Sequence, residues 1–185
     1  MTRLGALLLG WCWFSAGCDH APRDAPAEAS ALAVAERFVD AFYAWDPAAL
    51  ASTMADTDDR QRALYYQKWA EAGNYRVKTR RACRYRPGEP RVECAITVTD
   101  DIGGALGYVA TDTFVLTVEA DRIVAADFES DDPPIFAEVF AWMGEQRPDV
   151  LAGPCRDLFD GGTTPAECVR EVVRAARDYA ASLPR

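Results

Sequence analysis

Apolar residues recur every three or four positions after a short leader, and this spacing predicts three helices, over about residues 30–45, 47–55 and 59–72. Ser30 is a favourable cap for the first helix, and Asp46 is one for the second. The first helix has a wide apolar face, which indicates that it is buried: Leu32, Val34, Ala35, Phe38, Val39, Ala41, Phe42, Tyr43 and Trp45.

From residue 75 onward the apolar residues alternate with polar ones, which is the period of a β-strand. The alternation predicts four strands, over residues 75–86, 91–99, 108–119 and 122–129. Turn residues at 87–90 and 120–121 join neighbouring strands, and a glycine-rich connection lies between the second strand and the third. Connections of this kind predict an antiparallel meander.

Two further helices follow the strands, over about residues 134–146 and 165–182. Asp132-Pro133 can begin the first of them, and Thr164 with Glu167 has the pattern of a capping box at the start of the second. Together the elements predict one α+β domain over residues 30–185, in which residues 148–185 form a helical extension.

The first residues have the layout of a secretory signal peptide. Arg3 precedes an apolar run, residues 4–14, that is too short to span a bilayer as a helix. The following Ser15-Ala16-Gly17-Cys18 resembles a bacterial lipobox, which predicts cleavage after residue 17 and a lipid on Cys18. An ordinary signal peptide with an incidental cysteine is the alternative interpretation.

A lipid on Cys18 would anchor the chain to a membrane on the extracytoplasmic side of a bacterial cell envelope. Asp19 resembles the retention signal that keeps some lipoproteins of Gram-negative bacteria at the inner membrane. Residues 18–29 are rich in alanine, proline and charge, and we interpret them as a tether in which Pro22 and Pro26 prevent a continuous helix.

Four cysteines remain after the leader and the lipidated residue are set aside, and an even number in an exported chain predicts disulfides. They are Cys83, Cys94, Cys155 and Cys168. Mirror pairing about the turn at 87–90 places Cys83 opposite Cys94 and Arg84 opposite Glu93, an arrangement that favours a bridge across a hairpin. The other two cysteines bracket a short glycine-containing loop that a second bridge can close. A zinc site is disfavoured because paired C-x-x-C motifs are absent.

The chain carries 29 acidic and 20 basic residues, for a formal net charge of −9. This charge repels phosphate backbones, so we expect no nucleic-acid partner. The one histidine, His20, lies in the tether, which excludes histidine acid-base chemistry inside the domain. The acidic pairs lack the spacing of a calcium loop, and no metal or cofactor is predicted.

The opening helix pair contains Arg37-Phe38-Val39-Asp40-Ala41-Phe42-Tyr43-Ala44-Trp45-Asp46, followed by Leu50 and Met54-Ala55-Asp56. These residues resemble the opening helix pair of NTF2-like proteins, a family that includes SnoaL-like cyclases, ketosteroid isomerase and scytalone dehydratase. The resemblance is specific over residues 37–56 and elsewhere extends to the order of elements. It implies a cone, in which three N-terminal helices lie on a curved antiparallel sheet of about four strands. The disulfide-stapled C-terminal helices are an addition to that fold.

The chain departs from the catalytic members of this family. Phe38 stands where ketosteroid isomerase has a tyrosine that donates to the developing enolate oxygen. Asp56, Asp58 and Asp59 lead straight into a helix, so none of them takes the role of the catalytic carboxylate. These departures favour a domain without catalytic activity.

Two charged residues fall on the apolar side of the predicted strands. Arg81 is placed opposite Ile96, where it could hold an acidic ligand. Mirror pairing about residues 120–121 places Asp127 opposite Phe114, where a raised pKa would make it the base of an enzyme. The alternative, which we favour, is that the two charges pair with each other or reach the rim of the cone without a function.

Tyr65 and Trp69 are further candidates, because the third helix can place them at the mouth of the cone, although aromatic residues at this spacing are more often core. The expected function is therefore that of a non-catalytic lipoprotein domain that binds a small apolar or acidic ligand, or that contacts an envelope protein or a second copy of itself. The alternative is a lyase or isomerase that uses Asp127.

Overall fold

The computed structural model describes residues 25–184 except 87, 88, 90 and 163. The predicted lipid site at Cys18, its neighbour Asp19 and the signal peptide therefore lie outside the described residues. Within the described part of the chain, no helix is both long and apolar enough to cross a membrane.

Three helices open the described chain, α1 (Ala25–Tyr43), α2 (Pro47–Thr53) and α3 (Asp58–Ala72). The order is as predicted, but α1 begins before Ser30 and includes residues 25–29, which the sequence assigns to the tether. Pro26 does not prevent this, because a proline in the first turn lacks only an N–H that the helix does not use. The predicted cap of α2 is confirmed, since the carboxylate of Asp46 accepts hydrogen bonds from two backbone N–H groups of the first turn.

Five antiparallel strands form one open sheet, in the order β1-β3-β4-β5, with β2 also paired to β3. They are β1 (Arg76–Arg80), β2 (Arg84–Arg86), β3 (Arg91–Thr99), β4 (Ala110–Glu119) and β5 (Arg122–Ser130). The first predicted strand is thus two strands, and the pairing of β1 with β3 shifts at an irregularity between Val77 and Thr79.

The turn between β4 and β5 has Ala120 and Asp121 in the left-handed region, at φ 46° and 61°, as a two-residue hairpin loop requires. Next to this turn the register shifts by one residue between Thr117 and Val118. The shift moves every later pair of the hairpin away from simple mirror pairing, so that Phe114 lies opposite Phe128.

The glycine-rich connection contains a short helix, α4 (Asp101–Leu106), that the sequence did not predict. The side chain of Asp100 caps it, and Gly107 ends it with φ 81°, in the left-handed region that favours glycine.

The C-terminal elements are α5 (Pro134–Gln146), α6 (Pro148–Ala152), the 3-10 helix η1 (Leu158–Asp160) and α7 (Pro165–Ser182). The two long helices lie where they were predicted, whereas α6 and η1 were not predicted. The expected capping box at α7 does not form, and the Thr164 hydroxyl instead donates to the carbonyl of Pro154 at 3.0 Å.

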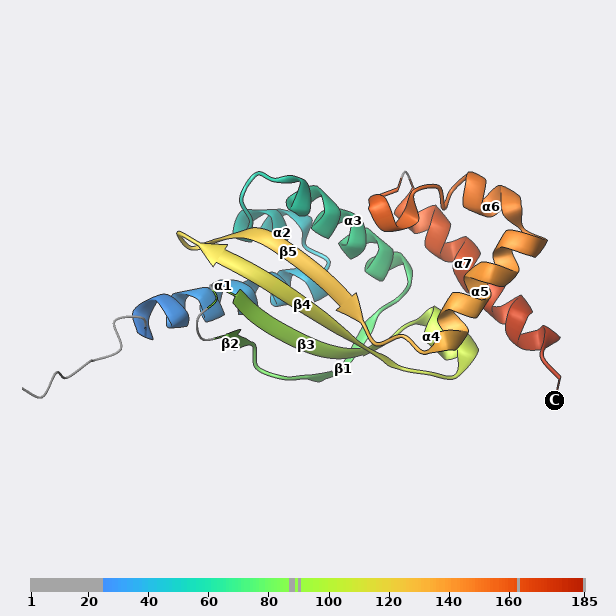
Figure 1. Ribbon diagram of the computed structural model, residues 1–185, viewed down its shortest axis with the longest axis horizontal. Coiled ribbons are helices and arrows are strands. Elements are labelled where there is room, and N and C mark those ends of the chain that lie inside the picture. The colour runs from blue at the N-terminus through green and yellow to red at the C-terminus, as the bar shows by residue number, and fades with distance from the viewer. Residues whose placement is uncertain (1–24, 87–88, 90, 163, 185) are drawn as a thin grey trace, which may run out of the picture.

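Two hydrophobic clusters fill the structure. The first lies between α1, α2 and the inner face of the sheet, and its largest buried side chains include Phe38, Phe42 and Leu116. The second joins α3 and α4 to α5 and α7, around Met143 and Val172. Figure 1 shows α5, α6 and α7 together at one end of the sheet, beyond the C-terminal end of α3. The C-terminal extension is therefore part of the folded core.

Both predicted disulfides are present. Cys83–Cys94 joins the start of β2 to β3, and the predicted pairing of Arg84 with Glu93 is confirmed. Cys155–Cys168 ties the loop after α6 to the first turn of α7.

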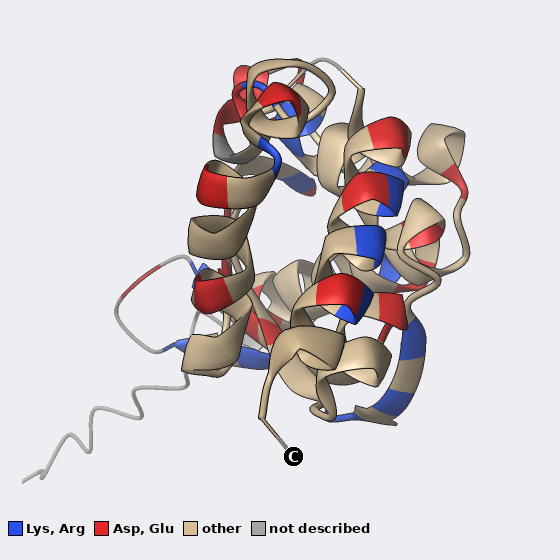
Figure 2. Cartoon of the chain, turned by 90° about the vertical axis from the view of Figure 1, so that its right-hand side faces the viewer, with Lys and Arg blue, Asp and Glu red and all other residues tan. Residues whose placement is uncertain are grey.

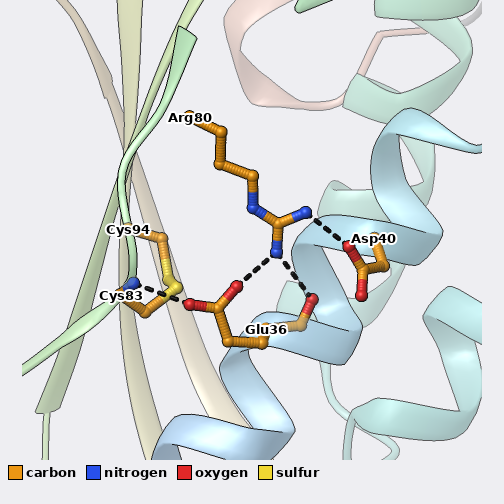
Figure 3. A network of polar contacts seen from close by, with 5 residues as sticks. All are labelled: Glu36, Asp40, Arg80, Cys83 and Cys94. Carbon is orange, nitrogen blue, oxygen red and sulfur yellow. Dashed lines mark hydrogen bonds and ion pairs between the residues drawn. A yellow bond between two sulfur atoms is a disulfide. The ribbon is translucent and has the colours of Figure 1, made fainter.

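A polar network fixes α1 against the first bridge (Figure 3). The carboxylate of Glu36 accepts the backbone N–H of Cys83 at 2.7 Å and pairs with Arg80, which also pairs with Asp40. The network therefore links α1 to the end of β1 and to the Cys83–Cys94 disulfide.

Charges of both signs alternate over the helices at the C-terminal end of the molecule (Figure 2). Arg147 pairs with Asp178, and Arg174 pairs with Glu171 on α7. This end therefore carries mixed charge and no broad field of one sign, which is typical of a solvated helix surface.

Candidate functional site

The two charged candidates from the sequence do not have their predicted partners. Arg81 is exposed, and Arg80 instead lies opposite Ile96, because the register changes by one residue between β1 and β2. Asp127 is also exposed and lies opposite Val115, because of the register shift near the hairpin turn. The predicted pairings of Arg81 with Ile96 and of Asp127 with Phe114 were therefore wrong, and both failed through one-residue shifts.

The two aromatic candidates have different positions. Tyr65 is buried in the second hydrophobic cluster against the C-terminal extension, and it does not border the cavity described below. Trp69, one turn further along α3, does border that cavity. The structure thus retains Trp69 as a site residue and assigns Tyr65 to the core.

The inner face of β4 carries a carboxyl group that the sequence analysis did not single out. Ala110, Asp112, Phe114 and Leu116 alternate along this face, and all four are buried. Asp112 is 2% exposed although it is a charged residue type. Such burial of a carboxyl is uncommon and requires a compensating interaction.

The hydroxyl of Tyr43 supplies that interaction, because it donates a hydrogen bond of 2.8 Å to Oδ2 of Asp112. Burial nevertheless raises the pKa of Asp112 to about 7, and the hydrogen bond from Tyr43 opposes this rise. Burial and the neighbouring carboxyl raise the pKa of Tyr43 as well, so its hydroxyl stays protonated. Oδ1 of Asp112 accepts no hydrogen bond from the described residues.

Two more carboxyl groups lie near Asp112. Asp100, before α4, and Asp132, before α5, each raise its pKa by repulsion. Burial raises the pKa of Asp100, against the hydrogen bond from the backbone N–H of Gly103 that lowers it. Burial also raises the pKa of Asp132. The region therefore gathers acidic groups whose ionised forms disfavour one another.

Tyr108 lies beside Asp132, but its buried hydroxyl makes no hydrogen bond of ordinary geometry with the described residues. The influence of Asp132 on it is therefore electrostatic. Burial and this carboxyl together raise the pKa of Tyr108 and keep its hydroxyl protonated.

A cavity of about 230 Å³ lies in front of Asp112, where the two hydrophobic clusters meet. Residues from α1, α3, β4, β5, α5 and η1 border it: Phe42, Tyr66, Trp69, Ala70, Tyr75, Asp112, Phe128, Ser130, Asp132, Phe136 and Leu158. Its volume is below the range of about 300–1,000 Å³ that is usual for drug-sized ligands, which suits a small, compact molecule.

A larger and more open groove, of about 690 Å³, borders α3 and β5. Its walls include the aromatic residues Phe38, Phe42 and Phe114. They also include the exposed Asp127, Glu129 and Arg62, so charges of both signs meet water there. We prefer the smaller cavity as the candidate site, because it combines enclosure with a buried carboxyl group whose pKa is strongly raised.

Among the described residues, no group of three or more His, Cys, Asp or Glu side chains is arranged to hold a metal ion. No protein-family model, no curated protein and no solved structure matches the chain. The site must therefore be interpreted from its own geometry.

The sequence contained a signal for Asp112. The residue interrupts an otherwise apolar alternation on the strand from 108 to 119, and an acidic residue at an inward position is unusual. Its partner Tyr43 belongs to the apolar stripe of the first helix, so the sequence indicates its burial but not its contact with Asp112.

Proposed function

We propose that this chain is an exported, lipid-anchored domain of NTF2-like type that binds a small molecule in the cavity in front of Asp112 without catalysing a reaction on it. The observation that carries the proposal is the cavity itself, with its aromatic walls and a carboxyl oxygen that accepts no hydrogen bond from the described part of the chain. A buried polar atom with an unused hydrogen-bonding capacity is a feature of sites that orient a ligand.

The order of elements supports the NTF2-like part of the proposal. Three helices precede an antiparallel sheet, and α1 and α2 cover its inner face. The rings of Phe38, Phe42 and Phe114 pack together between these helices and the sheet, and the smaller cavity lies toward the C-terminal extension. The extension therefore closes a space that the helices and the sheet leave open.

The lipid anchor is supported by the lipobox-like segment that ends at Cys18 and by the two disulfides. Disulfides persist in oxidising compartments, which an exported protein reaches. The anchor would hold the binding domain at the extracytoplasmic surface of the bacterial membrane.

Native mass spectrometry of the full-length lipoprotein, extracted gently from envelopes, tests the binding function. We expect a small molecule that remains bound to the wild type and is lost from Ala70→Leu, because Ala70 borders the cavity and the larger side chain would occupy it. Ala63→Leu is the matched control, since Ala63 is a buried alanine two turns earlier on α3 that does not border the cavity. Retention of the same molecule by both variants would refute the assignment of the cavity.

A second candidate function is acid-base catalysis by Asp112, as a lyase or isomerase. It replaces the expected role of Asp127, which the exposure of that residue removes. The observation that favours it is the pKa of about 7 of Asp112, because a group poised near neutral pH both accepts and releases protons.

Asp112→Asn separates the two functions, because asparagine keeps the shape of the side chain and cannot act as a base. Chemical conversion of the retained molecule that stops in this variant supports the enzyme. Release of the molecule in chemically unchanged form from the wild-type protein after prolonged incubation supports binding alone.

A further inference from the structure

Aromatic rings and carboxyl groups make up most of the wall of the cavity. Its six aromatic residues are Phe42, Tyr66, Trp69, Tyr75, Phe128 and Phe136. Its two acidic residues are Asp112 and Asp132, and no Lys, Arg or His is among the described residues that border it. Aromatic faces carry negative electrostatic potential, so both kinds of group favour the same sign of charge in a ligand.

The carboxyl groups have no positively charged partner among the residues that the structure describes. The ion pairs of the described residues involve neither Asp100, Asp112 nor Asp132. Their mutual repulsion is part of the reason that the pKa of Asp112 is raised. A single positive charge placed among them would stabilise their ionised forms, and a protonated amine would also donate a hydrogen bond to Oδ1 of Asp112.

Two of the rings pack against each other at the wall of the cavity. Tyr66 and Phe128 stack with their centroids 5.4 Å apart and their planes at 19°, and both border the cavity. A quaternary or protonated amine can therefore contact ring faces on one side and carboxylates on the other. An inorganic ion would leave the aromatic wall unused.

We propose that the ligand of this cavity is a compact organic cation, an amine or a quaternary ammonium compound, with its charged group between Asp112 and Asp132 and its apolar part against the aromatic rings. The inference rests on the proposed binding function and names the ligand class of that same cavity. It replaces the expectation of an acidic ligand, which depended on an inward Arg81.

The proposal has a consequence for pH. A cation binds the ionised form of Asp112 in preference to the neutral form, so its affinity should rise as pH increases through about 7. The groups that face Asp112 are Tyr43 from α1, Tyr75 from the segment before β1, Asp100 from the cap of α4, Tyr108 from the segment before β4, and Asp131 and Asp132 from the segment before α5. None of these is basic, and the three tyrosines have raised pKa values, so the carboxyl groups dominate the dependence.

The test compares pairs of probes that differ in charge and share a shape. Choline is paired with its uncharged carbon isostere 3,3-dimethylbutan-1-ol, and 2-phenylethylammonium is paired with 2-phenylethanol. Calorimetry with the detergent-solubilised full-length protein should show at least one cation binding about tenfold or more tightly than its neutral partner, with an affinity that increases between about pH 6 and about pH 8.

Substitutions of the two acidic residues test whether their carboxyl groups cause the preference for the cation. Asp112→Asn and Asp132→Asn should each reduce the affinity for the cation about tenfold or more, and leave the affinity for the neutral partner unchanged. Unchanged binding of the neutral partner shows that a variant is folded. Asp127→Asn is the matched control, because it removes an exposed carboxylate of β5.

Equal affinity of cation and neutral partner would overturn the cation proposal and leave a neutral-ligand site. Failure of both cations to bind would also overturn it, whereas the binding function would still be judged by the retained molecule in native mass spectrometry. A retained molecule that carries a negative charge would contradict the ligand class directly.

Discussion

The hydroxyl of Tyr43 donates a 2.8 Å hydrogen bond to the carboxylate of Asp112, and this contact joins α1 to the inner face of β4. The tyrosine stabilises a carboxyl group that would otherwise be buried without a partner, while it leaves the second oxygen free for the cavity. The two residues are far apart in the sequence, so the fold itself creates the site.

Replacement of Tyr43 with Phe should raise the pKa of Asp112 above its value of about 7, because the lost hydrogen bond favours the ionised carboxylate. The free energy of unfolding should fall by about 1 kcal/mol or more, and by more at about pH 8 than at about pH 5, since hydrogen bonds to charged groups are the stronger ones. Urea denaturation at both pH values measures this. Tyr179→Phe, which removes a hydroxyl bonded to the exposed Glu138, is the control and should show no such pH dependence. Equal losses at both pH values in Tyr43→Phe would contradict the account.

The raised pKa of Asp112 also predicts how stability depends on pH. The folded state keeps the proton up to about pH 7, whereas the unfolded carboxyl loses it near pH 4, so stability contributed by this group is present at low pH and is lost as pH rises to about 7. The difference between the pKa values of the folded and unfolded states corresponds to about 4 kcal/mol of stability. Asp112→Asn has no carboxyl group at this position, so it should not lose this stability as the pH rises. It should therefore be more stable than the wild type at about pH 8. Thermal unfolding across this interval measures the difference, and parallel curves for the two proteins would contradict the assignment.

The sequence predicted the local elements of this fold well, because helix periodicity, caps and alternation are local properties. The boundaries of β3 and α5 and the pairing of Cys83 with Cys94 were confirmed. The helix α4 was not predicted, because its glycines give it a low intrinsic propensity and its formation depends on the cap by Asp100 and on packing.

The candidate site was predicted less well than the fold. Regular alternation gave Arg81 and Asp127 their predicted partners, and a one-residue register shift in each hairpin removed those pairings. Bulges have weak sequence signals, and a shift of one residue moves a side chain to the opposite face of a sheet. Asp112 lies in a part of β4 that pairs regularly with β3, so the alternation identifies it correctly.

The bridge Cys155–Cys168 should contribute about 3 kcal/mol, because it closes a short loop and fixes η1 and the start of α7 against α3. Cys155→Ser with Cys168→Ser should lower the free energy of unfolding by about this amount. It should also weaken ligand binding, since Leu158 of η1 borders the cavity. Chemical denaturation without reductant measures the first effect. A stability equal to that of the wild type would show that packing alone holds the extension.

The predicted anchor is tested by incorporation of labelled palmitate in bacteria that express the full-length chain. We expect the label in the wild type and its loss in Cys18→Ser, because the thiol is the acylated group. Cys12→Ser is the matched control, since this cysteine lies inside the predicted signal peptide and is removed with it. Label in both cysteine variants, or in neither the wild type nor the control, would contradict lipidation at Cys18.

The most direct measurement of the central claim is an NMR titration of the Asp112 carboxyl carbon, assigned by comparison with Asp112→Asn, in the presence and absence of a cation that binds. We expect a pKa of about 7 in the free protein and a lower pKa in the complex, because a positive charge beside the carboxylate stabilises its ionised form. A carboxyl group that titrates near pH 4 in the free protein, or whose pKa does not change when the cation binds, would contradict the claim that Asp112 is buried at the wall of a ligand site.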